Sequence, residues 1–302
     1  MSASSEVTAA FRHRKLPNDG ALPGTTHQRR TVRNLDAIRS QLTDRDAAVL
    51  QAIWGHRVLT ARQVQALAFG ELPPTSGLRF AQVNLKKLRE LWVIGVSAQR
   101  RHGARPGRPE LIYYVDAVGD RLLRADVPDR VRYQWKEPSL HYLQHQLAIA
   151  DVHAELVKAQ HRGLLELVCC QLEPASWRRF FRLGTVVKLK PDLYVETTAE
   201  PGSAYLDGFF IEVDLGTESI PTLIRKCHDY QTYWQSGAEQ DDDGNGFPLI
   251  MWHLSHKDAA VAERRRKQLL AAIQKDRKLD PELFRITSPD NHINLIQKGG
   301  DL

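Results

Sequence analysis

Cysteine is scarce in this sequence, and its spacing suits neither cross-linking nor metal binding. The 302 residues contain three cysteines, Cys169, Cys170 and Cys227, and the first two are adjacent in an apolar run. An odd count with this spacing argues against a disulfide framework and against a paired zinc site. We therefore expect buried free thiols and a cytoplasmic protein.

Long apolar runs are absent as well. No segment reaches the ~20 apolar residues that a membrane-spanning helix needs, and no apolar stretch follows the basic residues near the N-terminus, so neither a membrane partner nor a signal peptide is expected. The formal net charge of +6 favours a polyanionic partner instead. With 42% hydrophobic residues, a chain of this length is predicted to bury the cores of two domains.

The N-terminal part of the sequence has helical spacing after an irregular start. Residues 1–40 are rich in Ser, Thr, Arg and Pro and are predicted to be a flexible basic arm. A domain over residues 41–125 follows. Thr43 is predicted to cap its first helix, with Asp46 completing a capping box, and a second helix starts after another threonine cap. A third helix over residues 76–91 has a predicted apolar face of Leu78, Val83, Leu85 and Leu88.

Two short strands, 93–96 and 111–115, come next, and an Arg-, Gly- and Pro-rich loop joins them. Three helices and a hairpin in this order are typical of a winged helix-turn-helix, whose third helix enters the major groove while the loop contacts phosphates or the minor groove. A solvated hairpin tip and a protein-binding winged helix are the alternatives. The predicted contacts to double-stranded DNA are Arg79, Lys86 and Lys87 on the third helix and Arg100, Arg101, Arg105 and Arg108 in the loop.

A polar segment around residues 120–137 marks the predicted boundary, and a second domain is expected over residues 138–290. A long helix from Ser139 to Gln160 opens it. The elements predicted after that helix are strands over 165–172, 186–195 and 208–214, a helix over 218–235, a strand over 247–253 and a basic helix over 257–275. The chain is therefore predicted to belong to the α+β class.

Carboxylates gather around one of these strands. Glu212 and Asp214 are two residues apart in Asp207-Gly-Phe-Phe-Ile-Glu-Val-Asp-Leu-Gly-Thr-Glu-Ser219, so their side chains leave the same face of a strand. Asp192 follows Pro191 at the start of another apolar run. If the two runs pair as antiparallel neighbours, the three acids meet at one end of a sheet, where their oxygens suit Mg²⁺ or Mn²⁺. An acidic cluster that is satisfied without a metal is the alternative.

Pro191-Asp192, followed by Glu212-Val-Asp214 on the next strand, resembles the PD-(D/E)XK nuclease core. The longer string Phe210-Ile-Glu-Val-Asp-Leu-Gly-Thr-Glu-Ser219, with Lys226 and Tyr230 downstream, resembles the bacterial replication-relaxation family, which is associated with plasmids and other mobile elements. The resemblance implies a winged helix joined to a PD-(D/E)XK-like α/β domain with a central mixed sheet. It also implies catalytic roles for Asp192, Glu212, Asp214 and Lys226, with the three acids as metal ligands.

One position departs from the nuclease pattern. Standard nucleases of this fold have a lysine two residues after the glutamate, and here that residue is Asp214. Lys226 on the following helix is the candidate for a displaced lysine, and an ordinary solvated lysine is the alternative. Asp214 is then either a third metal ligand or the mark of an inactive remnant. Tyr230 is a candidate nucleophile for relaxase chemistry, against simple packing in the helix.

Two functions are compatible with the sequence. The first is a metal-dependent DNA nickase or endonuclease of a plasmid or mobile element, which acts in replication or conjugative transfer with Mg²⁺ or Mn²⁺. The second is a non-catalytic DNA-binding regulator of replication or transcription that keeps the nuclease fold as a scaffold. A symmetric DNA site would imply a homodimer, although no dimerisation helix is evident in the sequence.

Overall fold

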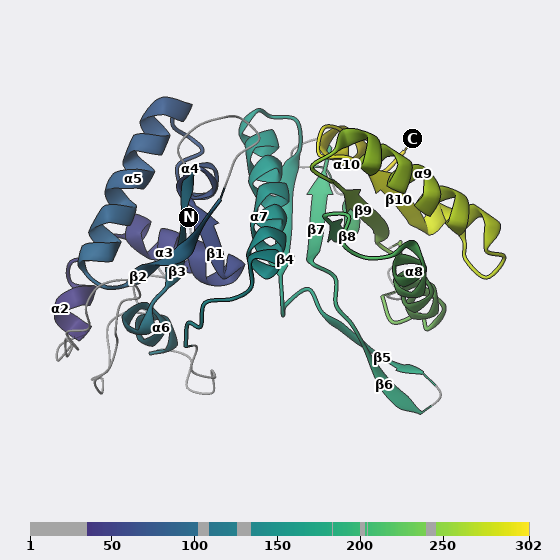
Figure 1. Cartoon of the computed structure of the whole chain (residues 1–302), viewed down its shortest axis with the longest axis horizontal. Helices are drawn as coiled ribbons and strands as arrows, with labels where there is room; N and C mark the ends of the chain where they lie inside the picture. The colour runs from purple at the N-terminus through teal and green to yellow at the C-terminus, as the bar shows by residue number, and fades with distance from the viewer. Residues whose placement is uncertain are drawn as a thin grey trace. The chain divides into compact units, whose positions relative to one another are not determined.

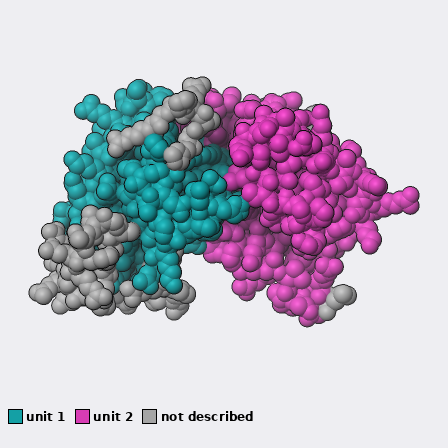
Figure 2. Space-filling view, in the orientation of Figure 1, with its two compact units in different colours: residues 1–154 teal, residues 155–302 magenta. Residues whose placement is uncertain are grey.

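A computed structural model describes residues 35–101, 109–125, 134–182, 184–199, 203, 205–239 and 246–301. The chain divides into two compact units, Met1–Ala154 and Glu155–Leu302 (Figure 2), and the division falls within helix α7 (Leu140–His161). The predicted domain ranges, 41–125 and 138–290, place the boundary earlier and stay a prediction. Both helices and sheets are present, so the predicted α+β class is confirmed. No helix within the described ranges is long and apolar enough to cross a membrane.

Short helices and a small sheet build the first unit (Figure 1). Thr43 and Thr60 each close a capping box with the side chain three residues later, which confirms both predicted helix starts. The buried core includes Leu50, Ile53 and Leu85. The elements are α2 (Leu35–Arg39), α3 (Asp44–His56), β1 (Val58–Thr60), α4 (Ala61–Ala68), α5 (Pro74–Glu90), β2 (Ile94–Arg101), β3 (Glu110–Val115) and α6 (Ala117–Arg124), with the strands in the order β1-β3-β2.

Three details of this unit differ from the sequence prediction. Val83 does not face the core and is 61% exposed, because the inward stripe of α5 runs through Ala81, Leu85 and Leu88, about half a helical turn away. The segment expected to be a polar boundary overlaps the last five residues of α6, and its Trp135 stacks on Tyr114 at 3.9 Å between ring centroids. The predicted basic arm lies outside the described residues up to residue 34, and its last residues form α2.

A mixed five-stranded sheet forms the centre of the second unit, in the order β10-β9-β8-β7-β4. Strand β8 pairs antiparallel with β7 and parallel with β9, which confirms the expected mixed sheet and the antiparallel pairing of the two acidic strands. Helices α8 and α9 pack their apolar side chains on one face of this sheet. The elements are β4 (Glu166–Leu172), β7 (Leu193–Thr198), β8 (Asp207–Asp214), α8 (Ile220–Gln235), β9 (Leu249–Leu254), α9 (Ala259–Lys275), η1 (Pro281–Leu283), β10 (Phe284–Thr287) and α10 (His292–Gln297).

The single strand predicted over residues 186–195 is wrong. The chain forms a separate hairpin of β5 (Arg178–Arg182) and β6 (Thr185–Leu189), and β7 begins only at Leu193. Pro191 explains the break, because it has no N–H to donate to a ladder. Its carbonyl oxygen instead accepts a hydrogen bond from Ser176 Oγ at 2.7 Å.

Two pairs of histidines, one in each unit, make the fold sensitive to acid: His153 is half-buried and the other three are buried. His56 Nε2 lies 3.0 Å from His153 Nδ1, a contact between α3 and α7. The rings of His253 and His292 meet edge to face with their centroids 5.0 Å apart. Burial, and then the charge of His153, lowers the pKa of His56 to about 3, and burial lowers that of His153 to about 4. All four rings are therefore neutral in the folded protein near pH 7.

We expect the protein to lose stability as the pH falls below about 6.5. The unfolded chain protonates these histidines near their ordinary pKa of about 6.5, whereas His56 and His153 in the folded chain resist protonation until pH 3–4, so the unfolded state gains protons first. The loss for His56 alone is roughly 2 kcal/mol at pH 5. Urea unfolding at pH 7.5 and pH 5.0 measures it. His56→Gln should flatten the dependence, exposed His161→Gln should not, and equal stability of the wild type at both pH values would contradict the prediction.

Candidate functional site

Asp192 and Glu212 meet at the junction of β7 and β8. Asp192 comes just before β7, and its Oδ2 accepts a hydrogen bond from the backbone N–H of Val213 at 2.7 Å. Both acidic side chains are buried, and their charges interact. The antiparallel register, with Leu193 opposite Ile211, brings the start of β7 to the end of β8 where Glu212 lies. The predicted convergence of these two acids is confirmed.

Helix α8 supplies two partners for Glu212. Lys226 Nζ lies 3.3 Å from Glu212 Oε2 and also 3.3 Å from Glu218 Oε1. Tyr230 donates its hydroxyl to Glu212 Oε1 at 2.6 Å. Lys226 and Tyr230 are four residues apart and therefore share one face of the helix. The helix thus presents a cation and a hydroxyl to the same carboxylate, and Lys226 does reach back to the acids as the sequence predicted.

The carboxyl group of Glu212 is poised to change its charge near neutral pH. Burial, and then the neighbouring charge of Asp192, raises its pKa to about 7, although Lys226 and Tyr230 act in the opposite direction. Burial lowers the pKa of Lys226, but the carboxylates of Glu212 and Glu218 outweigh it and raise that pKa overall. Burial and Glu212 raise the pKa of Tyr230 well above its ordinary value. Tyr230 is fully buried, so this geometry supports a role in holding Glu212 rather than attack on a phosphate.

Asp214 is occupied by contacts of its own. Its Oδ1 accepts hydrogen bonds from the backbone N–H groups of Gly216, Thr217 and Glu218, at 3.0, 3.2 and 3.4 Å. Arg265 of α9 donates to Oδ2 at 2.6 Å and to the carbonyl oxygen of Glu218 at 2.6 Å. Gly216 has φ +81°, a value that favours glycine. Asp214 therefore closes the β8–α8 turn and fixes α9 to it.

The acidic residues of this site fit a magnesium ion only if two of them, and not all three, are its ligands. The described residues contain no group of three His, Cys, Asp or Glu side chains placed to hold a metal. Asp192 and Glu212 remain as two adjacent carboxylates once Asp214 is assigned to its turn. Mg²⁺ is commonly held by one or two carboxylates together with waters and substrate phosphates, so two acids are enough. Lys226 and Tyr230 now occupy Glu212, and a cation would have to share that carboxylate with them.

The predicted DNA contacts of the first unit have different surroundings. Arg79 and Lys86 are exposed on α5. Lys87 forms an ion pair with the buried Asp46 at 2.5 Å, and Arg101 forms a two-pronged ion pair with Asp151 of α7. Arg100 donates to the carbonyl oxygens of Ser97 and Gln99, while Arg105 and Arg108 lie outside the described residues.

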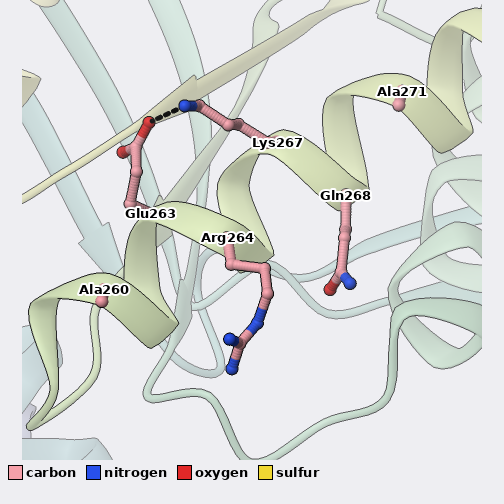
Figure 3. Close-up of a pocket in the computed structure, with 6 residues that line it drawn as sticks. All are labelled: Ala260, Glu263, Arg264, Lys267, Gln268 and Ala271. Carbon is pink, nitrogen blue, oxygen red and sulfur yellow. Dashed lines mark ion pairs between the residues drawn. The ribbon is translucent and has the colours of Figure 1, made fainter.

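A shallow pocket lies on α9, and neither Asp192, Glu212 nor Asp214 lines it. Figure 3 shows its lining along one side of a single helix, with an ion pair of 3.4 Å between Glu263 and Lys267. The residues that line it are Ala260, Glu263, Arg264, Lys267, Gln268 and Ala271. None of the residues predicted to form the catalytic site is among them. Substitutions on this surface are therefore suitable controls for substitutions of the acids.

Arg265 and Glu218 belong to the site's surroundings but were not predicted. The sequence predicts only a basic helix around Arg265. Its signal was in the spacing, because Arg265 and Arg266 fall on the stripe that runs from Ala262 to the buried Leu269 and Ile273. A basic residue on an inward stripe needs a buried acceptor, and Asp214 is that acceptor here. For Glu218, no spacing in the sequence predicted a contact with Lys226; it is only one of the acids in the segment 207–219.

Of the three comparisons with known proteins, only the one with family models found a match. Neither the search of curated proteins nor the search of solved structures returned a match. The family model of the replication-relaxation proteins matches residues 50–250, which is more than half of the chain and includes Asp192, Glu212 and Lys226. The matched range extends over parts of both units. The chain therefore belongs to the replication-relaxation family.

Proposed function

We propose that this protein is a metal-dependent DNA nickase or endonuclease that acts in the replication or transfer of a plasmid or other mobile element. Membership of the replication-relaxation family indicates the biological setting. The observation that carries the chemical part is the contact of 3.3 Å between Lys226 and Glu212, next to Asp192. The PD-(D/E)XK pattern combines two acids with a lysine two residues after the second acid. Here Asp214 occupies that position, and Lys226 would supply the lysine from α8 instead.

Each side chain has a distinct role in this proposal. Asp192 and Glu212 would hold Mg²⁺ or Mn²⁺, which supplies hydroxide and neutralises charge on a phosphodiester when it is bound. Lys226, with its side chain 39% exposed, would contact the scissile phosphate while it remains close to Glu212. Tyr230 orients Glu212 through its hydroxyl. Asp214 is left out of the ligand set because Arg265 and three backbone N–H groups already occupy it.

DNA recognition is assigned to the first unit in this proposal. Its helices and hairpin follow the order expected of a winged helix. Arg79 and Lys86 are exposed on α5, the third helix of the predicted pattern, and would meet phosphates; Lys86 has only a loose surface ion pair of 3.9 Å with Glu90. Lys87 and Arg101 would contribute less, because each forms a close ion pair with a carboxylate. Double-stranded DNA is the proposed partner.

A non-catalytic DNA-binding regulator is the second candidate, and one observation favours it. Both oxygens of Glu212 have partners within the protein, Lys226 on one and Tyr230 on the other. A buried carboxylate that is satisfied in this way needs no metal to be stable. In such a protein, the acids would support the fold, and removing them would leave DNA binding intact.

Cleavage of supercoiled plasmid that carries DNA of the host element tests the proposal. We expect the wild-type protein to convert the plasmid to open circles with Mg²⁺ or Mn²⁺, and Asp192→Ala and Glu212→Ala to reduce conversion to the background without protein. Glu263→Ala, which removes an exposed carboxylate on α9, is the matched control and should cut normally. Binding of Mn²⁺, followed by its electron spin resonance signal, provides a second readout.

The products separate the candidate functions. Open circles indicate a nick in one strand, and linear plasmid indicates a double-strand cut. If the wild-type protein retards the same DNA on a gel yet leaves it intact and binds no Mn²⁺, the regulator is the correct function. Unchanged cleavage by Glu212→Ala would show that the Glu212 carboxylate is not part of the catalytic site.

A further inference from the structure

The hairpin of β5 and β6 is a separate feature of the second unit. Its strands pair antiparallel from Arg178 opposite Leu189 to Arg182 opposite Thr185, and they belong to a two-stranded sheet of their own. Figure 1 shows this hairpin extending away from the five-stranded sheet. Because successive side chains of a strand point to opposite sides, the hairpin has two faces of different composition.

One face anchors the hairpin to its unit. Phe180 is buried and packs against Tyr233 of α8, with 5.1 Å between the ring centroids. Arg178 forms an ion pair of 2.5 Å with Glu239, and its guanidinium lies 4.5 Å from the ring centroid of Tyr194. The hairpin is therefore held in place from one side.

The opposite face, which we call the hairpin face, consists of Arg179, Phe181, Val186 and Lys188. Arg179 lies directly opposite Lys188, and Phe181 lies directly opposite Val186. Phe181 is 75% exposed and Val186 is 55% exposed. Behind them, Lys188 Nζ lies 3.4 Å from the ring centroid of Trp177. Cations thus occupy one half of the hairpin face and apolar side chains the other.

Stability does not explain this composition. Like charges directly opposite each other destabilise a sheet, and an exposed phenylalanine gains nothing from burial. Desolvation, and then repulsion from Arg179 and Lys190, lowers the pKa of Lys188, although the charge of Glu173 acts in the opposite direction. A bound polyanion would relieve the repulsion between these cations. The stretch 178–190 contains no acidic residue, and its basic residues are Arg178, Arg179, Arg182, Lys188 and Lys190.

We propose that the hairpin face binds DNA with unpaired bases. Arg179 and Lys188 would contact phosphates, and Phe181 would stack on a base, since cations beside an exposed aromatic ring are the usual means of holding a single strand. The proposal rests on the proposed action on DNA. It adds the form of DNA that is held by the hairpin, whose strand β6 leads through Lys190 and Pro191 to Asp192.

Binding in EDTA tests the hairpin face without any cleavage. The full chain is titrated against one labelled sequence in three forms: a single strand, a duplex, and a duplex with a central unpaired bubble. The variants are Phe181→Ala and Arg179→Ala/Lys188→Ala. The controls are Leu270→Ala and Arg264→Ala/Lys267→Ala, which remove an exposed apolar side chain and two exposed cations from α9. Thermal melts establish that all variants are folded.

We expect Phe181→Ala to weaken binding of the single strand and the bubble by about 10-fold and to leave duplex binding unchanged, because only unpaired bases can stack on the ring. Arg179→Ala/Lys188→Ala should weaken single-strand binding about 10-fold or more and lower its salt slope by roughly 1.4. The controls should bind like the wild type.

Two results would overturn the proposal separately from the proposed function. If wild-type protein binds DNA and both hairpin variants bind it equally well, DNA does not use the hairpin face. If Phe181→Ala weakens duplex and bubble equally, the ring does not stack on an unpaired base. Failure of the wild type to bind any of the three forms would instead refute the action on DNA on which the inference rests.

Discussion

Replacement of Lys226 by alanine is expected to lower the rate of plasmid nicking by roughly 100-fold, the usual loss when one preorganised charge donor is removed from a reacting phosphate or carbonyl. The affinity for DNA should change less than two-fold, because the charge of this one lysine is already balanced by Glu212 and Glu218. Lys226→Arg should recover part of the rate, since it keeps the charge but not the compact ammonium group. Exposed Lys267→Ala is the control.

The pH profile adds a signature that a merely structural lysine would not produce. Lys226 lowers the pKa of Glu212, whose net value is about 7. Without Lys226, Glu212 would keep its proton to higher pH, so the midpoint of Mn²⁺ binding should move upward by a measurable step. An unchanged rate with an unchanged midpoint would mean that Lys226 is an ordinary solvated helix lysine.

Replacement of Arg265 by alanine is expected to destabilise the protein by about 3 kcal/mol, because breaking a buried ion pair leaves an uncompensated charge. The side chains of Arg265 and Asp214 are 14% and 3% exposed, and the bond between them measures 2.6 Å. Its loss would leave Asp214 with three backbone N–H groups and no cation. For a unit of about 150 residues, this corresponds to a fall in Tm of roughly 6–12 °C.

A neighbouring residue provides the control for Arg265. Arg264→Ala removes an exposed cation from the same helix and should change stability by less than about 0.5 kcal/mol. The double variant Arg265→Met/Asp214→Asn should recover part of the loss, because it removes the buried charge together with its partner. Equal melting of Arg265→Ala and Arg264→Ala would show that the pair contributes little. Asp214→Asn with reduced Mn²⁺ affinity but normal stability would return Asp214 to the metal ligands.

Local chemistry made much of this fold predictable. The caps at Thr43 and Thr60 depend on residues three positions away, and both were predicted. Strand β8 was readable because its apolar run and its two acids have the period of a strand. The approach of Lys226 to Glu212 followed from one strand, one turn and one helix in sequence. In each case, the deciding contact lies within about 15 residues of chain.

The predictions failed where distant partners decide the structure. Strand β10 has four residues and exists because it pairs in parallel with β9, which ends 30 residues earlier in the sequence. The ion pair of Asp214 could not be predicted either, because its partner Arg265 lies 51 residues away. The hairpin of β5 and β6 was not predictable because Val186 and Val187 fit equally well at the start of a strand that continues through Pro191. Sequence periodicity contains no information on which neighbour pairs with which strand.

The two-stranded hairpin also has consequences for the protein's behaviour in concentrated solution. Neither β5 nor β6 has a second neighbour in the described sheet order, so each leaves one edge open to another molecule. The exposed Phe181 and Val186 would favour such edge-to-edge addition, and the closely spaced Arg179 and Lys188 oppose it. That protection is electrostatic and reaches only about 3 Å at 1 M salt. At low ionic strength, repulsion between the cations of two copies therefore prevents their hairpins from pairing edge to edge. A bound polyanion prevents the same pairing for a different reason, because it covers the surface.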